Sequence, residues 1–173
     1  MTQAIGNNYH NSHILEMAKE KLLLEEFLVK QSNLNERDSY GRNILYWAIK
    51  NRSQHNIKLL LKYNVDLMVE NDLHALFHTI SSNDADTFIL LLNSNMTNIN
   101  MRNKESQTLL MKAIEVESIE MVRHLINHGA DLFSVDDNGN SPIDYAKKCK
   151  NINVFELVHY RILFEKIQTK KSA

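Results

Sequence analysis

The chain has 173 residues, of which 43% are hydrophobic and 24% are charged, and its formal net charge at pH 7 is −1. This length is sufficient for one domain with a substantial core. A net charge this close to zero argues against a general nucleic-acid binder, which needs a basic surface. The single cysteine excludes an internal disulfide framework.

The start of the chain shows no secretory signal, because no basic region is followed by a long apolar run. No apolar stretch approaches the roughly 18 residues that a membrane span requires. We therefore expect a cytoplasmic location. The Asn-, Lys- and Ile-rich composition suggests an AT-rich genome and a bacterial source.

Residues 1–11 are polar and without periodicity, which predicts a flexible N-terminus. Between residues 12 and 31, apolar residues recur at helical spacing, which indicates two short antiparallel helices. Nothing before Ile14 has the turn that opens the later segments. We therefore predict that residues 12–34 form a degenerate cap.

Helical pairs then recur along a single predicted domain, residues 12–167. Equivalent apolar positions are Leu45, Leu76, Leu110 and Ile143, at spacings of 31, 34 and 33 residues. These spacings predict a shortened turn before the second pair and an extended turn after it. The expected boundaries of the four pairs are about 35–67, 68–100, 101–133 and 134–167. A flexible tail, residues 168–173, is expected to follow.

The junction between the last two pairs is the most informative stretch. Gly129 follows an amphipathic run and permits the left-handed conformation that closes a helix, a role that Asn64 is expected to take in the first pair. Asp136–Gly139 indicates a tight turn. Ser141 is a good N-cap, and Pro142 sits at the first helical position, where its missing N–H costs nothing.

This order resembles the junction between two ankyrin repeats, whose signature is a turn followed by Gly-x-Thr-Pro-Leu-His-x-Ala. Gly139, Ser141, Pro142, Ile143 and Ala146 match that signature, with Ser and Ile in place of Thr and Leu. The usual His is replaced by an Asp at position 144.

The resemblance implies an all-α fold, an ankyrin-repeat α-solenoid of stacked helix-turn-helix pairs joined by short hairpin turns. Each pair is too small to bury its apolar faces alone, so stability comes from stacking on neighbours. Charged residues near Lys19–Lys21 and Arg161–Lys171 are expected to make the outward faces of the end repeats polar.

In the family, the hairpin tips and the exposed side of the first helices form a concave surface that binds the partner. Trp, Tyr and Arg favour binding hot spots. Trp47 fits either the core or a contact, and Leu73 and Met111 are expected to be exposed. Carried over to this chain, the predicted partner-binding residues are Tyr40, Arg42, Trp47, Lys50, Asn71, Leu73, Phe77, Ser81, Glu105, Gln107, Met111, Glu115, Asn138 and Asn140.

Candidate chemistry is sparse. Two histidine pairs, His74/His78 and His124/His128, have the i,i+4 spacing that can hold a metal, but neither has a third ligand nearby in sequence. Cys149 is followed ten residues later by His159, but no orienting carboxylate is in evident reach, which favours an ordinary half-buried cysteine. The sequence also lacks a phosphate-binding glycine loop and a nucleophile elbow. We predict no enzyme activity, no metal and no cofactor.

Two hypotheses of function follow. The first is a non-catalytic module that binds one specific protein, for example as an inhibitor or immunity-type neutraliser, and that is a monomer on its own. The alternative is a structural or self-associating module, in which the long last helix and Met and Leu residues mediate a homodimer.

Overall fold

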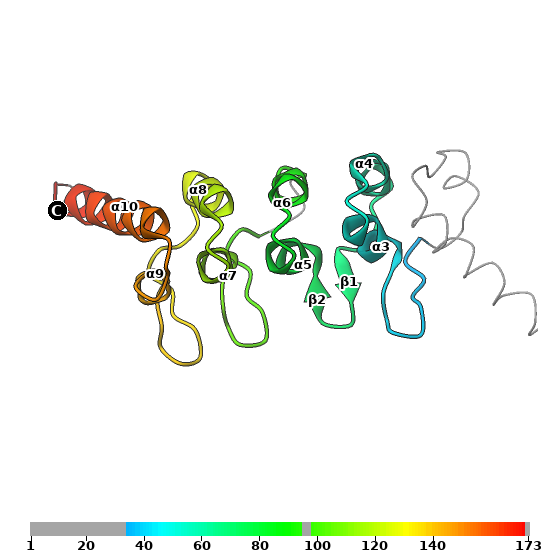
Figure 1. Cartoon of the computed structure of the whole chain (residues 1–173), viewed down its shortest axis with the longest axis horizontal. Coiled ribbons are helices and arrows are strands. Elements are labelled where there is room, and N and C mark those ends of the chain that lie inside the picture. Colours follow the sequence, from blue (N-terminus) through cyan, green and yellow to red (C-terminus); the bar gives the residue numbers. More distant parts are fainter. Residues whose placement is uncertain (1–33, 95–97, 172–173) are drawn as a thin grey trace, which may run out of the picture. The chain divides into compact units, whose positions relative to one another are not determined.

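The computed structural model describes residues 34–94 and 98–171. The predicted flexible N-terminus and all of the predicted cap except Leu34 lie outside the described residues. The chain divides into two compact units, one ending at His78 and one beginning at Thr79. Among the described residues, each unit contains short helices connected by turns and loops (Figure 1).

The first unit contains helices α3 (Ile44–Lys50) and α4 (Gln54–Lys62), which pack against each other. A small hairpin follows, in which β1 (Met68–Glu70) pairs antiparallel with β2 (Leu73–His74). Helix α5 (Ala75–Ser81) begins in this unit and crosses the boundary.

Helix α3 begins directly after Asn43, whose side chain serves as both a cap and a bridge. Its Oδ1 accepts a hydrogen bond from the Tyr46 N–H, at 3.1 Å. Its Nδ2 donates to the carbonyl oxygens of Asp66 and Met68, at 2.8 and 3.2 Å. Asn43 is fully buried, so it ties the start of α3 to the chain entering the next hairpin.

The end of α4 confirms the predicted role of Asn64, whose φ of 54° lies in the left-handed region. The hairpin that follows is short, as the spacing from Leu45 to Leu76 predicted. Only Asn71 and Asp72 separate the paired residues Glu70 and Leu73.

Within the described residues, the second unit holds the rest of α5 and five further helices, and short turns link α5 to α6, α7 to α8 and α9 to α10. Helix α7 packs against α8 and α9, and α10 packs against α8 and α9, while α6 packs against α8. The loops that precede α7 and α9 extend to the same side of this unit (Figure 1). The five helices are α6 (Ala85–Leu92), α7 (Leu109–Glu115), α8 (Ile119–Asn127), α9 (Pro142–Ala146) and α10 (Ile152–Lys171).

Local sequence explains the junction between α8 and α9. Gly129 has a φ of 81°, which closes α8 as predicted. Ser141 precedes Pro142, the first residue of α9, and its N–H donates to Asp144 Oδ2 at 3.1 Å. The substitution of Asp144 for the usual His therefore supplies half of a capping box.

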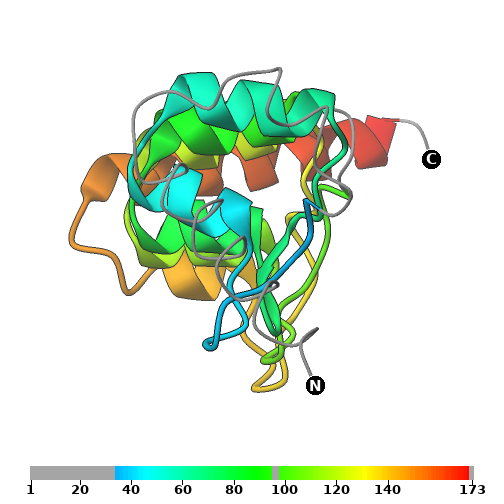
Figure 2. The ribbon, with the colours of Figure 1, turned by 90° about the vertical axis from the view of Figure 1, so that its right-hand side faces the viewer.

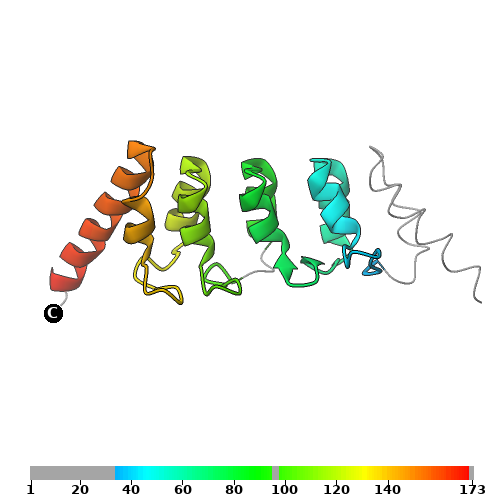
Figure 3. The ribbon, with the colours of Figure 1, turned by 60° about the horizontal axis from the view of Figure 1, so that its bottom comes forward.

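Helix α10 is the longest element. It continues to Lys171, four residues beyond the boundary predicted for the tail. Figure 2 and Figure 3 show its red C-terminal part extending past the ends of the shorter helices α7 and α8. Within the described residues, no helix combines the length and the apolar character needed to cross a membrane.

Candidate protein-binding surface

The first hairpin turn of the unit ending at His78 is organised by Asp38. Its Oδ1 accepts the N–H groups of Tyr40 and Arg42, at 2.9 and 3.0 Å, and its Oδ2 binds the Arg42 guanidinium at 2.8 Å. Burial opposes ionisation, but these hydrogen bonds lower the pKa of Asp38 below its ordinary value. Arg42 is thereby held in a fixed position beside the turn.

The Arg42 guanidinium lies at the centre of an aromatic cluster. Its carbon is 4.4 Å from the ring centroid of Tyr40, 5.2 Å from that of Tyr46 and 4.5 Å from that of Trp47. The Lys50 ammonium lies 5.0 Å from the Trp47 ring. We call Tyr40, Arg42, Trp47 and Lys50 the cation–aromatic patch. Tyr40 is 68% exposed, so the patch opens to solvent.

The turn carrying this patch is tied to the next hairpin. Arg37 donates to the carbonyl oxygens of Gly41 and Met68, at 2.7 and 2.8 Å, and to Asp66 Oδ2 at 2.9 Å. The Asn71 side chain lies directly over Gly41, where a Cβ would come within 2.2 Å of its Oδ1. Two successive hairpin tips of this unit are therefore in contact.

In the second unit, a polar network joins the last two repeats. The Tyr145 hydroxyl donates to Asp136 Oδ2 at 2.6 Å and accepts from Gln107 Nε2 at 2.8 Å. Asp136 Oδ1 accepts the N–H groups of Asn138 and Asn140, in the same pattern as Asp38 in the first turn. The hydrogen bond from Tyr145 is the main cause that lowers the pKa of Asp136 to about 2.

A shallow pocket of about 350 Å³ lies beside this network. Its lining mixes charges of both signs around the Tyr145 ring. Cys149 sits in the wall with its thiol directed to the Ile114 carbonyl oxygen at 3.2 Å, and burial raises its pKa. A thiol in this state is a poor nucleophile. The lining residues are Glu115, Glu117, Tyr145, Lys148 and Cys149.

Removing the Tyr145 hydroxyl tests the network. We expect Tyr145→Phe to be less stable than the natural chain at pH 7, and the difference to shrink on acidification. A carboxyl group with a lowered folded-state pKa stabilises the fold above its unfolded value of 3.8, and this stabilisation is lost as the pH falls towards about 2. Urea unfolding midpoints between pH 7 and pH 2.5 measure the difference.

Tyr40→Phe is the matched control, because it removes a hydroxyl from a tyrosine in the exposed patch. Its unfolding midpoints are expected to follow those of the natural chain at every pH. If the Tyr145→Phe curve ran parallel to the natural curve across the whole range, the hydrogen bond would not be what lowers the pKa of Asp136.

The structure places most of the predicted partner-binding residues at the surface, but it corrects two of them. Phe77 is 5% exposed and Met111 is fully buried, because both side chains point into the core of their repeats. Neither offers a surface to a partner, and the expected exposure of Met111 was wrong. The others are half-buried (Arg42, Trp47, Leu73, Gln107 and Asn140) or exposed (Tyr40, Lys50, Asn71, Ser81, Glu105, Glu115 and Asn138).

Several residues that build this surface were not predicted. Arg102 repeats the role of Arg37, donating to the carbonyl oxygens of Ser106 and Val135, each at 2.7 Å. Asn35 and Asn100 accept hydrogen bonds from the N–H groups of Asp66 and Asp131, in each case 31 residues further along the chain. The signal was present in the sequence, since Asn-x-Arg followed by Asp or Asn occurs at 35–38 and again at 100–103, two periods apart.

The histidine pairs have structural roles. His74 Nδ1 accepts the Leu76 N–H at 3.1 Å and so caps α5, and burial lowers its pKa. His78 stacks on Tyr46, with ring centroids 4.8 Å apart. His124 and His128 stack on each other at 4.2 Å. Among the residues that the structure describes, no three His, Cys, Asp or Glu side chains are grouped as metal ligands.

The repeated turn, cap and helix pair identify the architecture. A family model for ankyrin repeats, in three copies, matches residues 73–168, which is more than half of the chain. The chain belongs to the ankyrin-repeat family. Its helices fit the all-α repeat fold of that family. A continuous solenoid running through both units stays a prediction.

Curated relatives come from a virus and from mammals. Ankyrin repeat protein FPV244 of fowlpox virus is 28% identical over 138 residues, which are 78% of this chain and 20% of that protein. Ankyrin repeat protein FPV223 of the same virus is 28% identical over 121 residues, which are 69% of this chain and 84% of that protein. Mouse neurogenic locus notch homolog protein 1 is 27% identical over 134 residues, which are 76% of this chain and 5% of that protein.

These relatives give no support to the bacterial source that the composition suggested. The chain spans about one fifth of FPV244 and most of FPV223. Ankyrin repeats generally mediate protein–protein interaction rather than catalysis. The cytoplasmic location stays a prediction.

Proposed function

We propose that this chain is a non-catalytic module that binds one protein partner through the concave face expected for ankyrin repeats. The observation that carries the proposal is the cation–aromatic patch, where Arg42 and Lys50 lie against the rings of Tyr40 and Trp47. Trp, Tyr and Arg are the residues most enriched among interface hot spots.

The patch is held ready for binding before any partner arrives. Asp38 and the aromatic rings fix the Arg42 side chain, so little conformational entropy remains to be lost on association. Arg37 fixes the backbone of the same turn through the Gly41 carbonyl. A rigid aromatic and cationic surface of this kind favours a partner segment that combines apolar and acidic side chains.

The second unit carries a polar surface of its own. Glu105 and Asn138 are exposed in its two turns, and Gln107, Glu115 and Asn140 surround the Tyr145 network. Because these residues include both charged and neutral polar groups, they favour specific hydrogen bonds that orient a partner over a general attraction to polyanions. An inhibitor or immunity-type role remains a sequence-based hypothesis about what such binding achieves.

The test compares two variants as bait for partner capture. Tyr40→Ala with Lys50→Glu removes the exposed ring and reverses the exposed cation of the patch. The matched control is Lys62→Glu with Tyr63→Ala, which alters a cation–aromatic pair at the end of α4, where the ammonium lies 5.8 Å from the ring. Both variants are first checked by circular dichroism for an unchanged helical signal.

A protein captured by the natural chain and by the control, but at least tenfold less by the patch variant, is the expected result. Capture that is equal in all three would show that the binding face lies elsewhere. Capture lost equally in both variants would assign the effect to the change in net charge.

A further inference from the structure

We propose that the outer face of α10 binds the same face of a second copy of this chain, forming a two-fold symmetric, antiparallel dimer. The helix has two apolar faces. Val154, Val158 and Ile162 form the inner face and are buried within the second unit, which contacts α10 through α8 and α9. The inner face alone accounts for the packing of this helix in its unit.

The second face is apolar and exposed. Tyr160, Leu163, Phe164 and Ile167 are 64%, 43%, 50% and 52% exposed. Their spacing of i, i+3, i+4 and i+7 places them in one stripe along the helix, roughly opposite the inner face. Single exposed apolar residues need no explanation, but a contiguous stripe with helical periodicity marks a surface that another helix covers. We call these four residues the α10 stripe.

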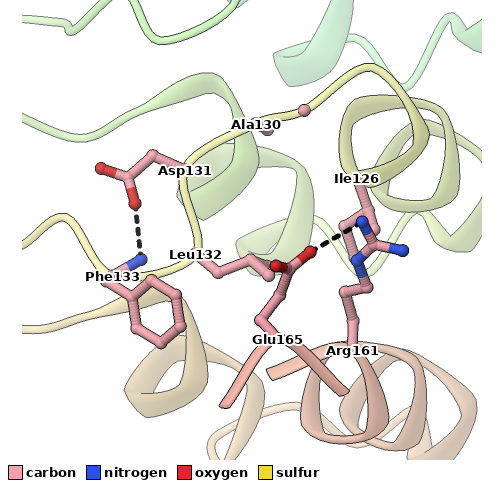
Figure 4. Close-up of a pocket in the computed structure, with 8 residues that line it drawn as sticks. Ile126, Ala130, Asp131, Leu132, Phe133, Arg161 and Glu165 are labelled. Atoms are coloured by element: carbon pink, nitrogen blue, oxygen red, sulfur yellow. Dashed lines mark hydrogen bonds and ion pairs between the residues drawn. The ribbon is translucent and has the colours of Figure 1, made fainter. Parts of the chain in front are cut away.

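The stripe contradicts the expectation that charged residues between Arg161 and Lys171 would make this face polar. Most of those charges lie beside the stripe, and Lys171 lies at its end. Arg161 pairs with Glu165 at 2.8 Å, and its guanidinium lies 5.6 Å from the Phe164 ring centroid. Figure 4 shows this ion pair turned towards Leu132 and Ile126, over a pocket of about 210 Å³. The ion pair therefore faces the unit itself, and only the Arg161 guanidinium borders the stripe, at Phe164.

A second copy fits the stripe because the pattern is symmetric about its midpoint, between Leu163 and Phe164. An antiparallel pairing about that point places Tyr160 opposite Ile167 of the partner subunit and Leu163 opposite Phe164 of the partner subunit. A two-fold interface requires such self-complementarity, since each patch meets itself.

The charges at the ends of the stripe are complementary in the same arrangement. Glu156 and Lys171 lie on the same side of the helix as the stripe, one at each end, and both are exposed. The antiparallel pairing brings Glu156 next to Lys171 of the partner subunit, twice in each dimer. A parallel pairing would instead place like charges together.

The area involved predicts a weak dimer. Aromatic side chains bury 150–250 Å² each, so the exposed parts of the four stripe residues amount to roughly 400 Å² of apolar surface per copy. Two copies would remove about 800 Å², which falls below the standard size of stable interfaces. We therefore expect a dissociation constant in the micromolar range.

Light scattering of the full chain between about 1 and about 200 µM tests the proposal. The mass is expected to rise from that of a monomer to that of a dimer. Phe164→Glu should weaken association about 100-fold or more, because each dimer contains the change twice. Ile152→Glu is the matched control, since Ile152 is 60% exposed on the same helix but lies beyond the paired region.

Charge reversal tests the antiparallel orientation. Glu156→Lys and Lys171→Glu should each weaken the dimer several-fold, and the double variant should restore it. A monomer at all concentrations would mean that something other than a second copy covers the stripe, and the proposal would be wrong. A dimer unaffected by Phe164→Glu would also overturn it, and absence of rescue would exclude the antiparallel pairing.

The dimer and the proposed partner-binding function can fail separately. Phe164→Glu is expected to leave capture through the cation–aromatic patch unchanged. Conversely, Tyr40→Ala with Lys50→Glu should leave the mass of the dimer unchanged, because both positions lie in the other unit.

Discussion

Asn43→Ala is expected to lower the free energy of unfolding by about 2–4 kcal/mol. The substitution removes the cap of α3, which accounts for about 1 kcal/mol, and deprives the half-buried Asp66 of the hydrogen bond to its carbonyl oxygen. The Met68 carbonyl keeps a hydrogen bond from Arg37, so it adds little to the loss. Urea denaturation followed by circular dichroism at pH 7 measures the change.

Asn43→Thr is the informative comparison, because Thr is the residue that ankyrin repeats usually carry here. Its hydroxyl can accept the Tyr46 N–H, but it has no amide with which to reach the Asp66 carbonyl. We expect it to recover about 1 kcal/mol relative to the alanine variant. If both variants lost the same free energy, the cap of α3 would contribute nothing.

Phe88→Ala is expected to cost about 3–5 kcal/mol, a large part of the stability of a domain of this size. Phe88 is the largest fully buried side chain in the described residues and comes from α6, which packs against α8. The loss combines the transfer free energy of the ring with the cost of the cavity that remains. Thermal and urea unfolding of the full chain both report it.

Leu90→Ala provides the control on the same helix. Leu90 is half-buried, so its truncation should cost about 1 kcal/mol and leave no closed cavity. Equal losses for Phe88→Ala and Leu90→Ala would indicate that the packing around α6 rearranges to fill the space.

The fold was largely predictable because the turn and cap residues are local signals. Asn64, Gly129 and the Ser141–Pro142 pair each adopt the backbone role that their chemistry dictates. The short hairpin at Asn71–Asp72 followed from spacing alone. Such features depend on a few residues that are adjacent in the chain, so they can be recognised from the sequence.

The candidate surface was less predictable because exposure depends on where repeats meet. Met111 and Phe77 sit on first helices, but the sequence does not state which side of a helix the next repeat covers. The Gln107–Tyr145 hydrogen bond joins residues 38 positions apart, and no periodic pattern in the sequence predicted this contact. The α10 stripe was hidden because one helix carries two apolar faces, and charged residues alternate with them.

The ties made by Arg37 and Arg102 bear on how this protein can change over time. Arg37 donates hydrogen bonds to the main-chain oxygens of Gly41 and Met68, and Arg102 donates to those of Ser106 and Val135. Main-chain oxygens are present whatever amino acid occupies a position. Exposed side chains of the tips that make none of the turn contacts, such as Glu105 and Asn138, can therefore change without loosening these ties, and a lineage could exchange one target for another while its architecture is inherited intact.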